Sequence, residues 1–535
     1  MSSLQDLPHE LIERIFLEAD AETIARCRQV CRHLNLVATQ SIAVQYKAEL
    51  GMVGFEDGPS EGLTPAERLE RLQRRKAAWR EMKPSNTRVI TAHKAWWKTV
   101  YGDHMLWVSS PKLAEKKLHV LRIPSVIRGI AEKEWSFDID TNLDKLDAIT
   151  MDPAQNLVIL PQNDGLSVRC MSTGVPHPSA VAPELPLDLG LGELNSRDIE
   201  NMAVSENYVG ATVVLDTTQR IKQAVVIFDW KSGNKLLQLE ETSLNIGFAF
   251  LTNQYLLLAH LSAKGSVVLS VIDIHAAVAT GYNGRSVSCS DIPSVCRLEL
   301  PRSRSPPKEL RIETSPAHRK RYDIPFHPSS NDQIFAVVIG DYATTLLLPR
   351  STIMDHLRKV VSGERRPTSP WAEWSSSKVA LFDHSTVWSV NGMTTVMEPP
   401  AITDPEGDRR RDEGSDGEVE FYLYDFASLE AQRLAKEKAQ NTGVKKSHFW
   451  TKNKQLEKNS TVQYRETFMS SRSGYDRRDH KRDIYTKFPA KRISVPKELW
   501  ARSYPDEVHV GDDCMVFVYE DRDEFHVCHY EIMSF

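Results

Sequence analysis

The residue pattern of this chain changes near residue 87. Before that point, apolar residues recur every three or four positions, as on one face of a helix. After it, short runs of Val, Ile, Leu and aromatic residues are bounded by Gly, Asn, Asp and Pro, which is typical of strands and turns. The 535 residues, 41% of them apolar and 26% charged, can bury an ample core. The sequence therefore predicts an α + β multidomain protein in which helices precede a large all-β domain.

Residues 4–50 contain two apolar stripes with helical spacing. The first includes Leu7, Leu11 and Ile15, and Pro8 stands where the first turn of a helix tolerates a missing N–H. The second begins at Ile24 after a polar interval. We expect two short amphipathic helices, which are too small to bury all of this apolar surface alone. A partner or the rest of the chain must cover the remaining apolar surface. Periodicity alone is also compatible with two helices that belong to the core of an ordinary globular domain.

The order of residues within these stripes resembles the F-box, a helical module that docks proteins onto the Skp adaptor of cullin-type ubiquitin ligases. The pattern reads Leu-Pro-x-Glu-Leu-Ile-x-x-Ile-Phe from Leu7 and Val-Cys-Arg-x-Leu from Val30. It covers under a tenth of the chain. Two positions depart from the family: Leu34 or its neighbour is often aromatic, and Tyr46 stands where a Trp is usual.

The resemblance implies a substrate-recognition subunit that binds a Skp-type adaptor, and through it a cullin ligase, with its F-box and a protein substrate with its β-domain. Such a receptor raises the local concentration of its substrate and is not itself an enzyme. Nine residues are expected to face the adaptor or to form the core of the module, two roles that periodicity does not separate. They are Leu7, Pro8, Leu11, Ile12, Ile15, Phe16, Val30, Cys31 and Leu34. The substrate-binding residues are not predicted.

A linker and a capped helix are expected in residues 51–86, between the F-box at 1–50 and the β-domain at 87–535. Thr64 is a candidate N-cap, Pro65 suits the first helical position, and Glu67 completes a capping box. Lys83 and Pro84 end the helix. Its many arginines could suggest an acidic partner, but they are interpreted as a solvated face. We expect this helix to pack beside the F-box and to fix its orientation.

The β-domain is predicted to be a degenerate seven-bladed β-propeller, with a β-sandwich or two smaller β-domains as alternatives. Residues 225–237 have the strand, Asp, turn-Gly and strand layout of a WD-type blade. Six further strand cores are 118–123, 166–170, 267–272, 345–348, 419–424 and 525–530. Five of the seven cores follow a second strand-like run, at 105–108, 157–160, 209–215, 255–259 and 514–518. Residues 87–92 could supply a missing outer strand and close the ring, which would protect a sheet edge.

Three segments are predicted to be insertions in the form of loops or disorder, because the spacing of the strand cores is irregular. They lie at about 301–328, 404–418 and 433–492. The last is basic and contains interleaved aromatic residues, a combination that can hold single-stranded nucleic acid. A nucleic-acid-associated β-protein is therefore the alternative function. Trp96, Trp97 and Tyr101 could line a recognition surface, although packing between blades is the preferred interpretation.

Several other function classes receive no support from the sequence. The net charge of −5 gives no whole-molecule argument for nucleic acid or membrane binding. Seven cysteines without metal-ligand or paired spacing predict reduced thiols in a cytoplasmic or nuclear protein, with neither metal nor disulfides. The most apolar run, 246–261, is short for a membrane span, and the first residues do not resemble a secretory signal. Because nucleotide-binding, hydrolase and zinc-protease motifs are also missing, no cofactor and no catalytic residue is predicted.

Overall fold

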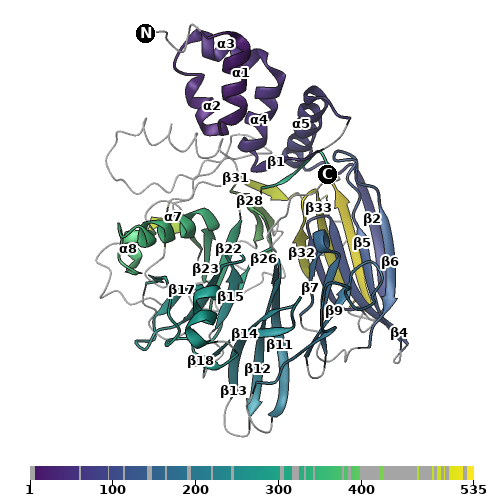
Figure 1. Cartoon of the computed structure of the whole chain (residues 1–535). Coiled ribbons are helices and arrows are strands. Elements are labelled where there is room, and N and C mark those ends of the chain that lie inside the picture. Colours follow the sequence, from purple (N-terminus) through teal and green to yellow (C-terminus); the bar gives the residue numbers. More distant parts are fainter. Residues whose placement is uncertain are drawn as a thin grey trace, which may run out of the picture.

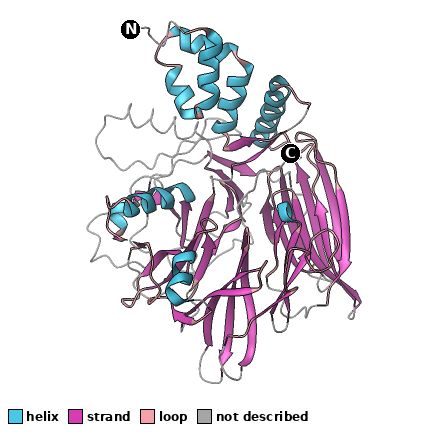
Figure 2. Ribbon diagram, in the orientation of Figure 1, coloured by secondary structure: helices cyan, strands magenta, loops and turns pink. Residues whose placement is uncertain are grey.

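The computed structural model places a small group of helices above a ring of β-sheets (Figures 1 and 2). The structure describes residues 7–59, 62–93, 95–112, 115–140, 148–162, 165–189, 194–217, 221–241, 246–282, 284–301, 307–315, 324–329, 333–340, 344–375, 379–382, 387–397, 421–426, 467–468, 485–486, 491–495, 499, 505–521 and 527–535.

The helical domain consists of α1 (His9–Glu18), α2 (Ala21–Cys27), α3 (Arg32–Gln40) and α4 (Ile42–Met52). The sequence predicted a single helix over the second apolar stripe, and this was wrong because the chain turns between α2 and α3. Cys31 has an extended backbone there, and its Sγ accepts a hydrogen bond from the Leu34 N–H, which caps α3. The four helices enclose their own core of Ile12, Phe16, Ile24, Leu34, Val37, Ala38 and Val44.

The segment that follows is a short strand, β1 (Phe55–Asp57), and a longer helix, α5 (Pro65–Glu81). The predicted capping box is confirmed, because the Glu67 N–H donates to Thr64 Oγ1 and the Thr64 N–H donates to the Glu67 carboxylate. The arginines of α5 do not form a free basic surface. Arg74 pairs with Glu70 on the same helix, and Arg75 pairs with Asp513 of the β-domain.

The β-domain is a seven-bladed propeller, as predicted. Each blade is one sheet whose first four strands are antiparallel, with a fifth, parallel strand on blades three and four. The strands follow chain order from the centre outward, except that the outer strand of blade seven is β2. Blade one holds β3 (Ala95–Tyr101), β4 (His104–Lys112), β5 (Glu115–Arg122) and β6 (Lys133–Asp138). Blade two holds β7 (Thr150–Asp152), β8 (Leu157–Gln162), β9 (Gly165–Cys170) and β10 (Glu184–Pro186). Blade three holds β11 (Leu194–Ser205), β12 (Tyr208–Thr217), β13 (Ile221–Asp229), β14 (Asn234–Glu241) and β18 (Ser286–Ser288).

Blade four contains β15 (Gly247–Phe250), β16 (Tyr255–Leu261), β17 (Val267–Asp273), β19 (Cys296–Glu299) and β24 (Thr368–Ser369). Blade five contains β20 (Leu310–Glu313), β22 (Ile334–Ile339), β23 (Thr344–Pro349) and β25 (Ala380–Phe382). Blade six contains β26 (Val387–Asn391), β27 (Thr394–Met397), β28 (Phe421–Asp425) and β31 (Lys491–Val495). Blade seven contains β32 (Glu507–Val510), β33 (Cys514–Glu520), β34 (Val527–Ser534) and β2 (Asn86–His93). The helices α6 (Ile274–Ala277), α7 (Arg350–Val361) and α8 (Trp371–Trp374) lie in connections of blades four and five.

Every predicted strand core belongs to a different blade, and each overlaps the third strand from the centre: β5, β9, β13, β17, β23, β28 and β34. The core at 225–237 continues from β13 through the turn into the fourth strand, β14. The five runs predicted before them lie in the second strands β4, β8, β12, β16 and β33. The WD-type turn is also present, since Asp229 Oδ1 accepts the Lys231 N–H at 3.0 Å and Gly233 has a φ of 80°. At such a φ a residue with a Cβ is strained, which explains the glycine.

The ring closes through β2, which forms the outer strand of blade seven. It pairs antiparallel with β34 along its whole length, from Asn86 opposite Ser534 to His93 opposite Val527. The expected closing strand is therefore present. Because the last blade is built from both ends of the domain, β34 has no open edge.

Of the three predicted insertions, one contains strands and the other two lie wholly or mostly outside the described residues. Segment 301–328 was predicted to be loop or disorder, but it contains β20, the innermost strand of blade five, and β21 (Phe326–Pro328), which pairs with β1. Segment 404–418 lies outside the described residues. So does most of 433–492, apart from the two-residue strands β29 (Thr467–Phe468) and β30 (Tyr485–Thr486) and the start of β31.

Candidate functional site

One face of α1 exposes apolar side chains that no other part of the described chain covers. Leu11 and Ile15 stand one helical turn apart and are 44% and 47% exposed. Pro8 precedes them at the start of α1, also exposed, and Val30, in the turn before α3, is 71% exposed. Side chains of this kind are normally buried, so a cluster of them on one small domain indicates a surface for a partner.

The helical domain is joined to the propeller by a strand pair as well as by the chain itself. Strand β1 pairs with β21, which lies in the connection between the first two strands of blade five. Gly58 fits against the same connection, because a Cβ there would lie 2.0 Å from the Ile324 carbonyl oxygen. The Tyr46 hydroxyl, buried in α4, lies 2.9 Å from Asp57 Oδ1 and 3.3 Å from the Pro325 carbonyl. Burial raises the pKa of Tyr46, which keeps this donor protonated.

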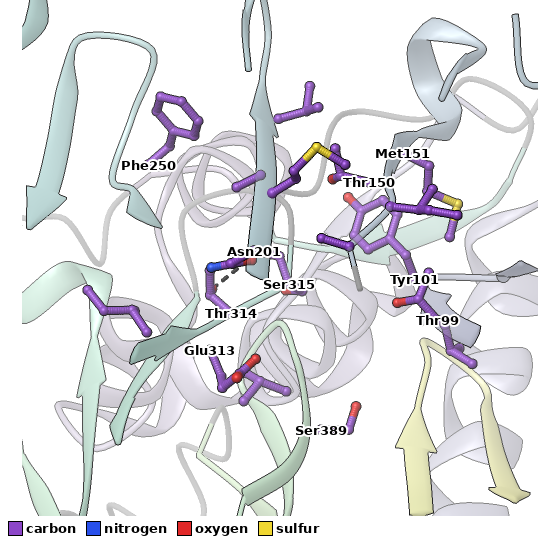
Figure 3. A pocket seen from close by; sticks show the side chains of 18 of the residues that line it. Thr99, Tyr101, Thr150, Met151, Asn201, Phe250, Glu313, Thr314, Ser315 and Ser389 are labelled. Carbon is purple, nitrogen blue, oxygen red and sulfur yellow. Dashed lines mark hydrogen bonds between the residues drawn. The ribbon is translucent and has the colours of Figure 1, made fainter. Parts of the chain in front are cut away.

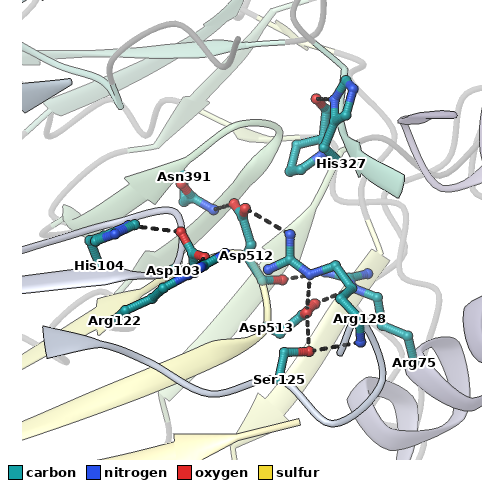
Figure 4. A network of polar contacts seen from close by, with 11 residues as sticks. Arg75, Asp103, His104, Arg122, Ser125, Arg128, His327, Asn391, Asp512 and Asp513 are labelled. Carbon is teal, nitrogen blue, oxygen red and sulfur yellow. Dashed lines mark hydrogen bonds and ion pairs between the residues drawn. The ribbon is translucent and has the colours of Figure 1, made fainter. Parts of the chain in front are cut away.

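A buried ionic network fixes α5 to blades one and seven (Figure 4). Asp513, in the turn between β32 and β33, accepts hydrogen bonds from Arg75 Nε at 2.6 Å and from Ser125 Oγ at 2.7 Å. Arg128 Nε donates to the same carboxylate, and Arg128 Nη1 donates to Asp512 Oδ2 at 3.2 Å. The Arg128 side chain is fully buried, and both aspartates are almost so. Burial would raise the pKa of Asp513, but the charges of Arg128 and Arg75 lower it.

The network also reaches blade six. Asn391, the last residue of β26 before the turn to β27, donates from Nδ2 to Asp512 Oδ1 at 3.1 Å. In blade one, the Gly102 carbonyl accepts the Asp512 N–H at 2.8 Å. These turns all join a first strand to a second strand, so they lie on the same face of the ring. The helical domain and α5 therefore occupy this face of the propeller.

Aromatic packing completes the attachment of α5. The Trp79 indole stacks on Phe535 with ring centroids 4.4 Å apart, and both belong to a core shared with blades six and seven. The Arg75 guanidinium lies 4.3 Å from the centre of the Phe55 ring in β1. The same guanidinium donates a hydrogen bond from Nε to Asp513, so one arginine side chain links α5 to both β1 and blade seven. Strand, ionic and aromatic contacts together hold the helical domain at a fixed position on the ring.

The second candidate site is the central channel of the propeller (Figure 3). A cavity of about 270 Å³ is lined by residues at or beside the innermost strands of all seven blades, from β3 in blade one to β32 in blade seven. Its polar wall includes Lys98, Glu200, Glu313, Gln333 and His509.

The ammonium group of Lys98 in this wall is already paired with carboxylates. Lys98 Nζ lies 2.9 Å from Glu507 Oε1 and 3.4 Å from Glu520 Oε1, and His509 Nε2 lies 3.0 Å from Glu507 Oε2. Burial would raise the pKa of Glu507, but the hydrogen bond from His509 and the charge of Lys98 lower it to about 2. Glu507 is therefore ionised throughout the physiological range and holds Lys98 in place.

Comparison with known proteins identifies the N-terminal part. Residues 4–43 match the family model described as F-box-like. The N-terminal helices form an F-box-like domain. No curated protein matches the chain significantly.

Two of the similar solved structures are distant likenesses. The WD40 domain of coronin from Toxoplasma gondii aligns with 8% identity over 84% of this chain and 86% of that chain, with a TM-score of 0.34. An acylaminoacyl peptidase from Pyrococcus horikoshii aligns with 8% identity over 65% of this chain and 52% of that one, with a TM-score of 0.24. At these scores the propeller assignment rests on the sheet topology of this chain and not on the alignments.

The structure divides the nine residues singled out in the F-box-like domain. Ile12, Phe16 and Leu34 are core residues, whereas Leu7 and Cys31 are half-buried and pack against that core. The remaining four are exposed: Pro8, Leu11, Ile15 and Val30.

Sequence reasoning missed two exposed apolar residues of the F-box-like domain, Leu36 on α3 and Ile42 at the start of α4. With Leu11, Ile15 and Val30 they make five of the ten large apolar side chains that are exposed in the described residues. Leu36 departs from the helical spacing of its neighbours Leu34 and Val37, and that departure was the available signal.

The early aromatic residues and the basic segment lie largely outside the described residues. The side chains of Trp96 and Trp97 lie outside the described residues, whereas Tyr101 lines the channel. The basic segment 433–492 remains a prediction, since nearly all of it lies outside them too. Within the described part of the chain, no helix is long and apolar enough to span a membrane. In that same part, no group of three or more His, Cys, Asp and Glu side chains could hold a metal ion.

Proposed function

We propose that this chain is the substrate-recognition subunit of a cullin-type ubiquitin ligase. The F-box-like domain docks onto a Skp-type adaptor, and the propeller holds a protein substrate. The observation that carries the proposal is the exposed apolar face of Leu11 and Ile15, which belong to the residues that carry the family pattern. A partner that covers this face gains the free energy of burying it.

The fixed attachment of the F-box-like domain supports a role in positioning. Ubiquitin transfer needs the substrate near a charged conjugating enzyme, and a receptor contributes by holding the two at a defined separation. A loose linker would spread the substrate over many orientations. Here the β1–β21 strand pair, the Asp513 network and the Trp79–Phe535 stack restrict that freedom. The receptor then needs no catalytic residue, and its role lies in the cytoplasm or nucleus.

The test is the double substitution Leu11→Ser with Ile15→Ser. Burying a whole Leu or Ile side chain contributes about 1.5–3 kcal/mol, and close to half of each is exposed. Losing both contacts should therefore weaken adaptor binding by roughly 1.5–3 kcal/mol, or about 10- to 150-fold. Calorimetric titration with a purified Skp-type adaptor, together with co-purification from cells, measures this loss.

The matched control is Val126→Ser with Val361→Ser, which removes two exposed apolar side chains from the β-domain. This variant should bind the adaptor like the wild type. Because all four residues are exposed, both variants should fold. Undiminished adaptor binding by the α1 variant, or equal losses in both variants, would contradict the proposal.

A further inference from the structure

A second cavity lies where the F-box-like domain meets the propeller, and we call it the junction cavity. It has a volume of about 90 Å³. Residues 53–55 and three residues of α5 form one side of it. Strands and turns of blades six and seven, with Pro328 of β21, form the other side. Figure 4 shows Arg75 from the first side and Asn391 from the second. The cavity is therefore complete only while α5 is docked on the ring.

Two buried side-chain atoms in the wall of the junction cavity lack a hydrogen-bond partner among the described residues. They are Nε1 of Trp79, a residue that is 8% exposed, and Oδ1 of Asn391, which is 6% exposed. By contrast, the indole N–H of the equally buried Trp374 donates to the Glu299 carbonyl at 3.0 Å. Buried polar groups are normally paired, because an unpaired one has lost its hydration without compensation. Two such atoms in one cavity wall indicate a ligand that pairs with them.

The chemistry of these two atoms defines what the ligand must offer. An indole Nε1–H can only donate a hydrogen bond. The Asn391 amide is oriented by its Nδ2, which donates to the Asp512 carboxylate at 3.1 Å, so its Oδ1 is an acceptor. The ligand must therefore contain an acceptor for Trp79 and a donor for Asn391.

The charge and the size of the junction cavity favour a small neutral molecule. Its wall contains two cationic side chains, Arg75 and Lys76, and two anionic ones, Asp425 and Asp512, so these charges sum to zero. An ion would lose its hydration there without meeting a matching excess of opposite charge. Most of the other lining side chains are apolar. The volume equals that of about three water molecules at ~30 Å³ each, which is room for a few heavy atoms.

We propose that the junction cavity binds a small neutral molecule that carries a carboxamide group. The carboxamide oxygen accepts the Trp79 indole N–H, its NH2 group donates to Asn391 Oδ1, and a short apolar stem lies against the apolar wall. Because the wall belongs to both α5 and the propeller, the ligand binds the docked arrangement and stabilises it. This site is separate from the exposed face of α1, and it does not depend on the ligase role.

The first test compares three small probes on the full chain with ¹⁵N-labelled tryptophan indoles. Propionamide should shift the Trp79 indole N–H resonance in a saturable manner, and the variant Trp79→Phe identifies that resonance. Butanone has a methyl group in place of the NH2 group, and propionate has a charged oxygen there. Both should bind at least about threefold more weakly than propionamide, because neither donates to Asn391 Oδ1. This comparison is made on the wild-type chain, so it does not depend on how a variant folds.

The second test compares two Trp→Phe variants by ligand-observed NMR titration with propionamide. Trp79→Phe removes the unpaired donor and keeps an aromatic ring beside Phe535, so affinity should fall about threefold or more. The matched control is Trp374→Phe, which changes a similarly buried indole on α8, outside the cavity. It should bind propionamide like the wild type, and melting curves of both variants verify that they are folded.

The third test measures the effect of the ligand on the docking of α5. At a propionamide concentration ten times its Kd, amide hydrogen exchange that requires detachment of α5 should slow about tenfold. Exchange in α1 should not change, because α1 does not contribute to the cavity.

The outcomes separate this inference from the proposed function. No saturable shift of the Trp79 indole, equal affinity for the three probes, equal losses in the two variants, or unchanged exchange in α5 would overturn the carboxamide site. A chain that binds the adaptor but not propionamide refutes only the junction site, and the reverse result refutes only the ligase role.

Discussion

Replacing Asp513 by asparagine tests whether the buried ionic network holds α5 on the propeller. The side chain keeps its shape but loses the charge shared by Arg128, Arg75 and the Ser125 hydroxyl. Arg128 is fully buried, and of the two aspartates that pair with it only Asp512 would keep its charge. Removing one member of a buried ion pair typically costs about 3–5 kcal/mol, because the other charge stays desolvated.

This cost can be converted into a melting shift. Unfolding entropy is about 2.1 cal/mol/K per residue, so a cooperative unit of about 450 residues should lose roughly 1 °C of melting temperature per kcal/mol. We expect Asp513→Asn to lower the midpoint by about 3–5 °C at a fixed heating rate. Hydrogen exchange should also become faster in α5 and in the turn between β32 and β33.

The control is Glu70→Gln on the same helix. Glu70 pairs with Arg74, and both side chains are largely exposed, so this change should cost at most about 1 kcal/mol. Equal midpoints for the two variants, or unchanged exchange in α5, would refute the reasoning, because burial would then add nothing to the strength of the network.

Three further predictions concern packing, closure and pH. Trp79→Ala should destabilise the attachment of α5 by about 3–5 kcal/mol, measured by hydrogen exchange, because a buried indole stacked on Phe535 is lost. Ile90→Pro should disrupt β2 and expose the edge of β34, which light scattering should detect as aggregation; a monodisperse variant would contradict it. Burial lowers the pKa values of His260 and His356, so the unfolded chain binds more protons below pH ~6.5. Stability should fall between about pH 7 and about pH 5, and a flat melting profile across that range would count against it.

The blade count was predictable because second and third strands are buried on both faces. Strands such as β17 and β23 are almost entirely buried, so they read as continuous apolar runs. Some first strands are short, with three residues in β7 and four each in β15 and β20, and β20 lies within a Pro- and Arg-rich segment. Composition there resembles a loop, so the sequence could not reveal a strand whose pairing with β22 is decided by tertiary contacts.

The candidate sites were predictable to different degrees. The family pattern located the F-box-like residues, but only the fold shows that Ile12 faces the core while Leu11 next to it faces solvent. The Asp512–Asp513 pair between two apolar strands was a visible signal of a special role. Its partner Arg128 could not be found, because hundreds of residues separate them in the chain. The residues that line the channel could not be predicted for the same reason, since they come from seven segments that are far apart in the sequence.

The closure of the ring by β2 and β34 has a consequence for synthesis. Thr91 and His529, which face each other across this pair, are 438 positions apart. At roughly 5–20 residues per second, the ribosome synthesises β34 about 20–90 s after β2, and β2 stays unpaired during that interval. The F-box-like helices have a local core and can fold during that interval. The exposed apolar face of α1 would therefore exist before the propeller does. Under the proposed function, a nascent chain could recruit the adaptor while its own unpaired strands still need a chaperone.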